Sequence, residues 1–138
     1  MIDAFSQINF LAVLTATVAN FLLGGIWFAA LFAKPYARAL GIEDRPPLRP
    51  APIFLIGPLL CGAVTIVTTA FLLQALRIDD YGNALGLGAI IGVGYLGAMT
   101  VNIAINPLFP RPFYYAMINV PLFVIGSLVS CVILVAMS

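Results

Sequence analysis

The stretch Gly82–Asn106, GNALGLGAIIGVGYLGAMTVNIAIN, determines the architecture, because it is uncharged and too rich in glycine to form a stable helix in water. It carries six of the twelve glycines of the chain, and in water each glycine costs a helix about 1 kcal/mol relative to alanine. In a bilayer the backbone has no other hydrogen-bond partner and stays helical, and glycines become surfaces for close helix contact. We therefore predict the central helix of a small membrane bundle, with packing contacts at Gly82, Gly86, Gly88, Gly92, Gly94 and Gly97.

The rest of the chain has the composition of a membrane protein. It has 138 residues, of which 63% are hydrophobic and 8% are charged, whereas soluble domains are about 25% charged. The charges are clustered, and the four uncharged runs between them are 27 to 30 residues long, which exceeds the roughly 20 residues that a spanning helix needs. The pattern predicts an all-α integral membrane four-helix bundle, a single transmembrane domain over residues 1–138, with helices at about 8–32, 52–75, 82–106 and 113–137.

The segments between the spans carry local predictions of their own. Residues 34–43, KPYARALGIE, read as a short helix at the membrane surface that ends at Gly41, and the proline-rich residues 45–52 read as an extended linker. Asp79 and Asp80 stand just before the third span. Acidic side chains favour a helix N-terminus, so capping is a better interpretation of this pair than a cation site.

The basic residues predict the orientation. Four spans place the loops at 33–51 and 107–112 on one side of the membrane, and these loops hold five of the six basic residues of the chain: Lys34, Arg38, Arg45, Arg49 and Arg111. Cytoplasmic loops carry the excess of lysine and arginine. We therefore predict that both loops are cytoplasmic and that both termini lie outside.

The two basic loops also contain similar sequences. Leu31–Leu40, LFAKPYARAL, and Leu108–Met117, LFPRPFYYAM, agree at seven of ten positions when conservative pairs are counted. Each segment follows an odd-numbered predicted helix, which suits two parallel helix-pair repeats around an axis along the membrane normal. Convergence is the alternative, because membrane edges favour aromatic and basic residues in any case.

Polar side chains gather toward the basic side of the predicted bundle. The candidate polar cluster consists of Asn102, Asn106, Asn119, Trp27, Lys34 and Arg111. Its asparagines suit the binding of a small polar solute, a lipid head group or a partner's backbone, but asparagines also form hydrogen bonds between helices. Trp27 has two interpretations, an aromatic anchor at the interface and the wall of a pocket; it shares a helix face with Asn20 and Gly24.

Two motifs resemble a known family. Gly24–Pro35, GGIWFAALFAKP, is similar to the G-x-W-Y-S-P-x-x-F-G-K-x-W signature of the DUF1761 membrane proteins. Asn106–Pro112, NPLFPRP, with Asn119 beyond it, resembles the third-loop pattern of the same family. The resemblance implies a four-helix protein of the bacterial inner membrane, and it implies no activity.

The chain departs from that signature at several positions. Phe28 stands where tyrosine is usual, Ala29-Ala30 replace Ser-Pro, and Tyr36 lies near the usual second tryptophan. These changes remove hydroxyl and indole donors from any pocket built on the motif.

The predicted spans contain no ionisable Asp, Glu, Lys or Arg, and the chain contains no histidine. Ion-coupled carriers and enzymes depend on such groups, so we expect no enzyme, no cofactor and no metal. A net charge of +1 without a basic run argues against nucleic acid as a partner.

We predict a non-enzymatic membrane protein that works as a homo-oligomer or as an accessory or structural subunit of a larger membrane complex. Its partners are the lipid bilayer and other membrane protein chains. The alternative is a small multimeric channel or carrier for a neutral or weakly charged solute.

Overall fold

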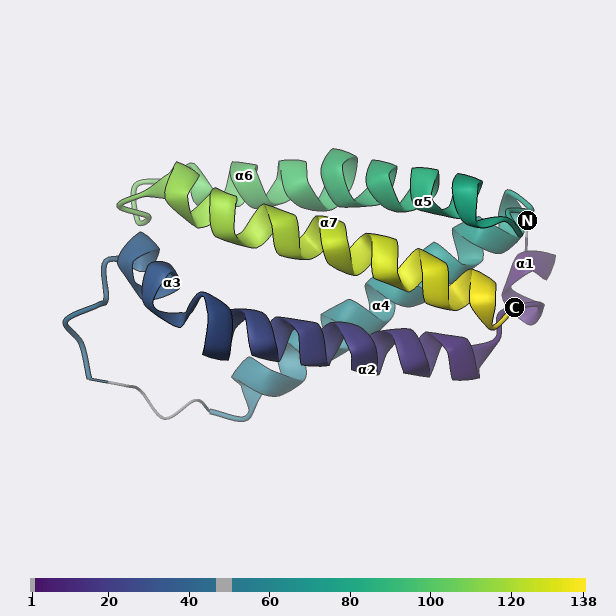
Figure 1. The fold of residues 1–138 in the computed structure, drawn as a ribbon, viewed down its shortest axis with the longest axis horizontal. Helices are drawn as coiled ribbons and strands as arrows, with labels where there is room; N and C mark the ends of the chain where they lie inside the picture. The colour runs from purple at the N-terminus through teal and green to yellow at the C-terminus, as the bar shows by residue number, and fades with distance from the viewer. Residues whose placement is uncertain (1, 47–50) are drawn as a thin grey trace.

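The structure is a computed structural model that describes residues 2–46 and 51–138, and the regular structure in these residues is helical (Figure 1). In chain order the elements are α1 (Asp3–Ser6), α2 (Phe10–Ile26), the π-helix η1 (Trp27–Leu31), α3 (Ala33–Leu40), α4 (Ile53–Ala75), α5 (Tyr81–Ala89), the π-helix η2 (Ile90–Gly97), α6 (Ala98–Ala104) and α7 (Pro112–Ala136). Four continuous helices in the described residues are long and apolar enough to cross a membrane: Phe10–Leu31, Ile53–Ala75, Tyr81–Ala104 and Pro112–Ala136. The prediction of an all-α fold with four membrane-spanning helices is confirmed.

Two asparagines set helix boundaries. The first span begins at Phe10 because Asn9 has an extended backbone and its side-chain oxygen accepts a hydrogen bond from the backbone N–H of Leu11 at 3.0 Å. The third span ends at Ala104 because Asn106 turns the chain, and its Oδ1 accepts the backbone N–H of Leu108 at 2.7 Å.

Asp80 caps the third span, as the sequence predicts. Its Oδ2 accepts the backbone N–H of Asn83 at 2.8 Å, and its Oδ1 accepts the side-chain amide of the same residue at 2.8 Å. These donors, the backbone N–H first, hold the pKa of Asp80 below its usual range. The carboxylate therefore stays ionised where a helix N-terminus favours negative charge.

The surface helix in the first basic loop is α3, which ends at Gly41 with a left-handed φ of 69°. Lys34 and Arg38 on this helix lie at the surface. Of the predicted proline-rich linker at 45–52, residues 47–50 lie outside the described residues, and Arg49 is one of them. α3 and the loop at 107–112 lie at the end of the bundle opposite α1 and the C-terminal end of α7 (Figure 1).

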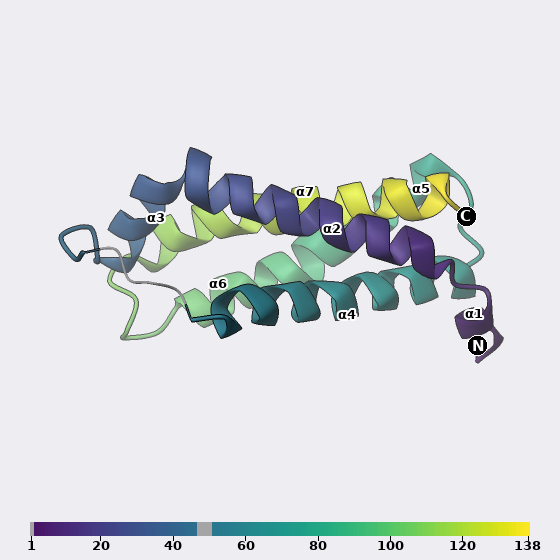
Figure 2. The ribbon, with the colours of Figure 1, turned by 90° about the horizontal axis from the view of Figure 1, so that it is seen from below.

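The central helix is α7, which corrects the prediction that the glycine-rich span occupies the centre. α7 packs against α2, α3, α4, α5, η2 and α6 (Figures 1 and 2). Of the most apolar segment of α7, 50% is buried. Of the corresponding segment of the glycine-rich span, 33% is buried. The reason is that only one side of the glycine-rich span packs against α7, whereas its other side is exposed.

Three of the six glycines predicted to form packing contacts meet α7 directly. A methyl group on Gly92 would lie 2.9 Å from the Cα of Val124, and one on Gly88 would lie 3.2 Å from the Cα of Leu128. A methyl group on Gly97 would lie 3.2 Å from the Val120 side chain. The other three lie elsewhere: Gly82 lies beside Asp80, while a methyl group on Gly86 or Gly94 would meet no atom within 4 Å.

The main hydrophobic core lies toward one end of the bundle. The main hydrophobic core joins the N-terminal half of α2, the C-terminal halves of α4 and α7, and α5 with the start of η2. The buried residues of α4 all lie between Ile66 and Leu73. Ile53, Phe54 and Leu55, at the other end of α4, are exposed. The packing therefore leaves space beside the N-terminal half of α4.

Candidate functional site

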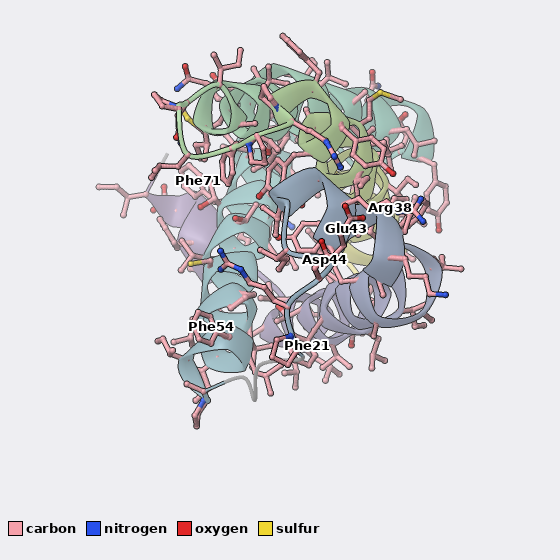
Figure 3. The ribbon with its side chains drawn as sticks, turned by 90° about the vertical axis from the view of Figure 1, so that its left-hand side faces the viewer. Phe21, Arg38, Glu43, Asp44, Phe54 and Phe71 are labelled. Carbon is pink, nitrogen blue, oxygen red and sulfur yellow. The ribbon has the colours of Figure 1, made fainter. Side chains whose placement is uncertain are left out.

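A cavity of about 800 Å³ lies between α2, α4 and α7, within the roughly 300–1,000 Å³ that is typical of ligand pockets. Its lining runs from Tyr36 and Phe54, near the end that carries the basic loops, to Thr69 and Ser130, deeper in the bundle. Figure 3 views the bundle from the α3 end and shows two lining residues, Phe21 of α2 and Phe54 of α4, on the same side of the molecule. None of the described residues that line it is Asp, Glu, Lys or Arg.

The cavity exists because small residues stand where larger ones would fill the gap. Gly24 and Gly25 of α2 and Gly62 of α4 all line it, and a Cβ at any of them would meet no atom within 4 Å. Pro58 of α4 also lines the cavity. The lining is otherwise mainly aliphatic and aromatic, so the cavity suits a ligand with an apolar body.

The inner end of the cavity is polar and is organised by Asn20. Its Nδ2 donates one hydrogen bond to the carbonyl of Ala16 at 2.9 Å and another to Oγ of Ser130 at 2.8 Å. Gly126 permits this arrangement, because a methyl group there would collide with the Asn20 side-chain oxygen. One hydrogen bond thereby ties α2 to α7 and leaves that oxygen available.

The outer end of the cavity carries Asn119 and Tyr36. Asn119 is only 3% exposed, and its Nδ2 donates to the carbonyl of Tyr115 at 2.9 Å. The Tyr36 ring packs against Phe28, with ring centroids 4.7 Å apart. Burial, followed by the proximity of Tyr115, raises the pKa of Tyr36 to about 12, so its hydroxyl is neutral at physiological pH.

Trp27 ties the π-helix η1 to α7 beside this outer end. Its indole N–H donates to the carbonyl of Ile118 at 3.0 Å, three residues before Pro121. Pro121 removes the backbone donor that would meet the carbonyl of Met117, and the Ile118 carbonyl that accepts from Trp27 is the next one along the helix. Trp27 is thus an interhelical donor, and it is not among the residues that line the cavity.

A side-chain hydrogen bond joins α7 to α5. Among the described residues, no side chain of α4 makes a hydrogen bond to another helix. Ser127 Oγ donates to the carbonyl of Gly88 at 2.9 Å. The hydroxyls of Thr65, Thr68 and Thr69 on α4 all donate to carbonyls of their own helix. Apolar contacts alone therefore hold α4 against its neighbours in the described part of the chain.

The structure divides the predicted polar cluster. It brings Asn119 to the cavity and Trp27 beside it. Asn102 is exposed, with Met99 Sδ at 4.0 Å, and Asn106 is used in the turn after α6.

The two predicted basic residues of the cluster lie at the end face of the bundle. Lys34 is exposed. Arg111 donates to the carbonyl of Arg38 at 2.8 Å and so joins the loop before α7 to α3. Arg38 also pairs with Glu43 at 3.5 Å, and these two residues lie with Asp44 across this end (Figure 3).

The residues that form the inner end are absent from the predicted cluster. Asn20 shares a helix face with Trp27 but does not belong to the cluster as predicted. Ser127 and Ser130 are small polar residues three positions apart in the otherwise apolar C-terminal half of α7, with Gly126 beside them. That grouping was the available signal, because polar residues in a spanning helix normally face protein.

The site can bind a neutral molecule, but it does not form an acid–base arrangement. Within residues 2–46 and 51–138, no three His, Cys, Asp or Glu side chains come close enough to hold a metal ion together. The polar groups of the lining are amides, hydroxyls and one thiol. They can orient a ligand by hydrogen bonding.

Comparison with known proteins identifies one family. The model of a family described as a protein of unknown function, DUF1761, matches residues 11–135 and so covers nearly all of the four spans. No curated protein and no solved structure gave a significant match.

Proposed function

The chain belongs to the DUF1761 family of proteins of unknown function, and from its own geometry we propose that it is a non-enzymatic membrane protein that binds a neutral, largely apolar molecule between α2, α4 and α7. This proposal shares its ligand class with the alternative from the sequence, a small multimeric channel or carrier for a neutral or weakly charged solute, but places the ligand within one chain.

The observation that carries the proposal is the uncharged cavity of about 800 Å³. A charged ligand would leave its charge unpaired at membrane depth, which is costly, whereas an apolar body would pack against the lining. The N-terminal half of α4 supports entry from the side, because its buried residues all lie in the C-terminal half and no described residue of α4 makes a side-chain hydrogen bond to another helix.

The test uses the single tryptophan of the chain, Trp27, as a probe. The protein is placed in nanodiscs and titrated with a bromine-labelled dodecyl chain, which quenches indole fluorescence at close range. We expect a saturable quenching component that disappears in Gly24→Leu, which fills the cavity, and persists in Gly94→Leu, which adds the same side chain on the outer surface. Equal quenching in all three proteins would contradict the proposal.

A second candidate function is assembly with another membrane chain, either a second copy or a subunit of a larger complex. It is supported by the outer surface of the glycine-rich span, where Gly86 and Gly94 are exposed on the same span as the amide of Asn102. Asn102 is exposed in the last turn of this span, where its amide can form hydrogen bonds with a neighbouring helix. Asn102→Leu should then lower the oligomeric mass measured after extraction in a mild detergent, and an unchanged mass would contradict this candidate.

The proposed location is the inner membrane of a bacterium, with the loops at 33–51 and 107–112 in the cytoplasm and both termini outside. The excess of basic residues in these loops supports this orientation. A reporter enzyme that works only outside the cytoplasm, fused to the C-terminus, should be active. A fusion that is active only with a cytoplasmic reporter would reverse the orientation.

A further inference from the structure

We infer that the ligand of the cavity carries a hydroxyl group that donates a hydrogen bond to the side-chain oxygen of Asn20. This inference rests on the proposed function and names the chemical class of the ligand. The ligand is a neutral lipid-soluble alcohol, with an apolar body along the lining and a hydroxyl at the inner end.

The hydrogen bonds of Asn20 decide which part of its amide is free. Both hydrogens of Nδ2 are used, by the carbonyl of Ala16 and by Oγ of Ser130. The Ala16 carbonyl can only accept, so chemistry fixes which end of the amide is nitrogen. The oxygen accepts no hydrogen bond from any described residue. Asn20 therefore has a free acceptor, which lies beside Gly126 in the lining of the cavity, and no free donor.

The hydroxyl groups around Asn20 also offer a ligand acceptors and no donors. Ser130 donates to the carbonyl of Gly126 at 2.8 Å, and Ser127 donates to the carbonyl of Gly88 at 2.9 Å. Thr17 and Thr69 donate to carbonyls four residues earlier in their own helices. Each hydroxyl hydrogen is already used within the protein, and only lone pairs remain. The inner end thus selects ligands that donate.

The depth of Asn20 argues that the donor is neutral. Asn20 is the eleventh of the 22 residues in the first span, Phe10–Leu31, and so lies at its middle. A cationic donor such as an ammonium group would need a counter-ion there, and the described lining contains no carboxylate. A hydroxyl group donates without that cost.

Asn119 at the outer end does not discriminate in this way. Its Nδ2 donates one hydrogen bond, to the carbonyl of Tyr115, which leaves a second hydrogen free. It can therefore donate as well as accept. Selection for an alcohol resides at Asn20.

The test compares an alcohol with the ether in which a methyl group replaces the hydroxyl hydrogen, so that the donor is lost. Wild-type protein in nanodiscs, loaded with the bromine-labelled chain, is titrated with dodecanol or with its methyl ether. We expect dodecanol to displace the labelled chain about 3- to 30-fold more effectively, the range that a hydrogen bond between membrane helices provides. Asn20→Leu, of similar shape, should remove the preference. Thr15→Val, a lipid-facing change on the same helix, should keep it.

The outcomes separate this inference from the proposed function. Equal displacement by the alcohol and the ether in wild type would overturn the inference and leave the proposed function standing. Displacement by neither compound would overturn both. Gly126→Ala provides an independent variant, because its methyl group pushes the Asn20 oxygen aside without removing the amide. A full preference for the alcohol in this variant and in Asn20→Leu would also refute the role of Asn20.

Discussion

Replacing Gly92 with alanine should separate the glycine-rich span from α7, whereas the same change at Gly94 should not. The two residues are two positions apart in η2, but they face opposite environments. A methyl group at Gly92 would lie 2.9 Å from the Cα of Val124 and 3.3 Å from the Cβ of Ser127. A methyl group at Gly94 would meet no atom within 4 Å.

The magnitude follows from the contact distances. Carbon atoms that are not bonded pack at about 3.5–4.0 Å, so the two helices must move apart by about 0.6–1 Å at Gly92. Overpacking of this kind costs about 1–3 kcal/mol. The same movement stretches the hydrogen bond from Ser127 to Gly88, which is now 2.9 Å long. Replacing glycine in a helix returns at most about 1 kcal/mol. We expect a net loss of about 1–2 kcal/mol for Gly92→Ala and no loss for Gly94→Ala.

The assay is unfolding of the purified protein in mixed micelles by increasing sodium dodecyl sulfate, followed through the fluorescence of Trp27. Gly92→Ala should unfold at a lower fraction of the denaturing detergent than wild type, and Gly94→Ala should unfold at the same fraction or a higher one. If Gly92→Ala is as stable as Gly94→Ala, the close approach of η2 to α7 is wrong.

Three further changes probe the cavity and its surroundings. Gly24→Leu should be at least as stable as wild type, because it fills open space and removes a helical glycine; a marked loss of stability in the detergent titration would show that this space is absent. Tyr36 has a pKa raised to about 12, so the unfolded state releases its proton at lower pH than the folded state, and stability should fall as pH rises above about 10. Tyr36→Phe should reduce that fall, by about 1 kcal/mol after allowance for partial exposure, and an unchanged stability profile from pH 8 to 11 would contradict the assigned burial. Trp27→Phe removes the donor to Ile118 and should cost about 0.6–2 kcal/mol, measured by near-ultraviolet circular dichroism during the same titration; wild-type stability would mean that this hydrogen bond contributes nothing.

Local features of the sequence were sufficient to predict the number and type of the spanning helices and several of their ends. Hydropathy is a local property, so four uncharged runs predict four spans. Capping is also local, because Asp80 reaches a backbone N–H only three residues away. The family could be identified from the short motifs around Trp27 and Asn106 for the same reason.

Only the packing of the helices shows which one is central and where the candidate site lies. The glycines at 92 and 94 are chemically identical, and the position of α7 alone distinguishes a packed glycine from an exposed one. Asn20 and Ser130 are 110 residues apart, so no local pattern joins them. Asn102 looked equivalent to Asn119, but Asn102 is exposed and Asn119 is buried against the cavity. Helix composition fixes that a segment crosses the membrane, whereas the rotation of each helix about its axis depends on side-chain packing between helices, which the sequence alone leaves open.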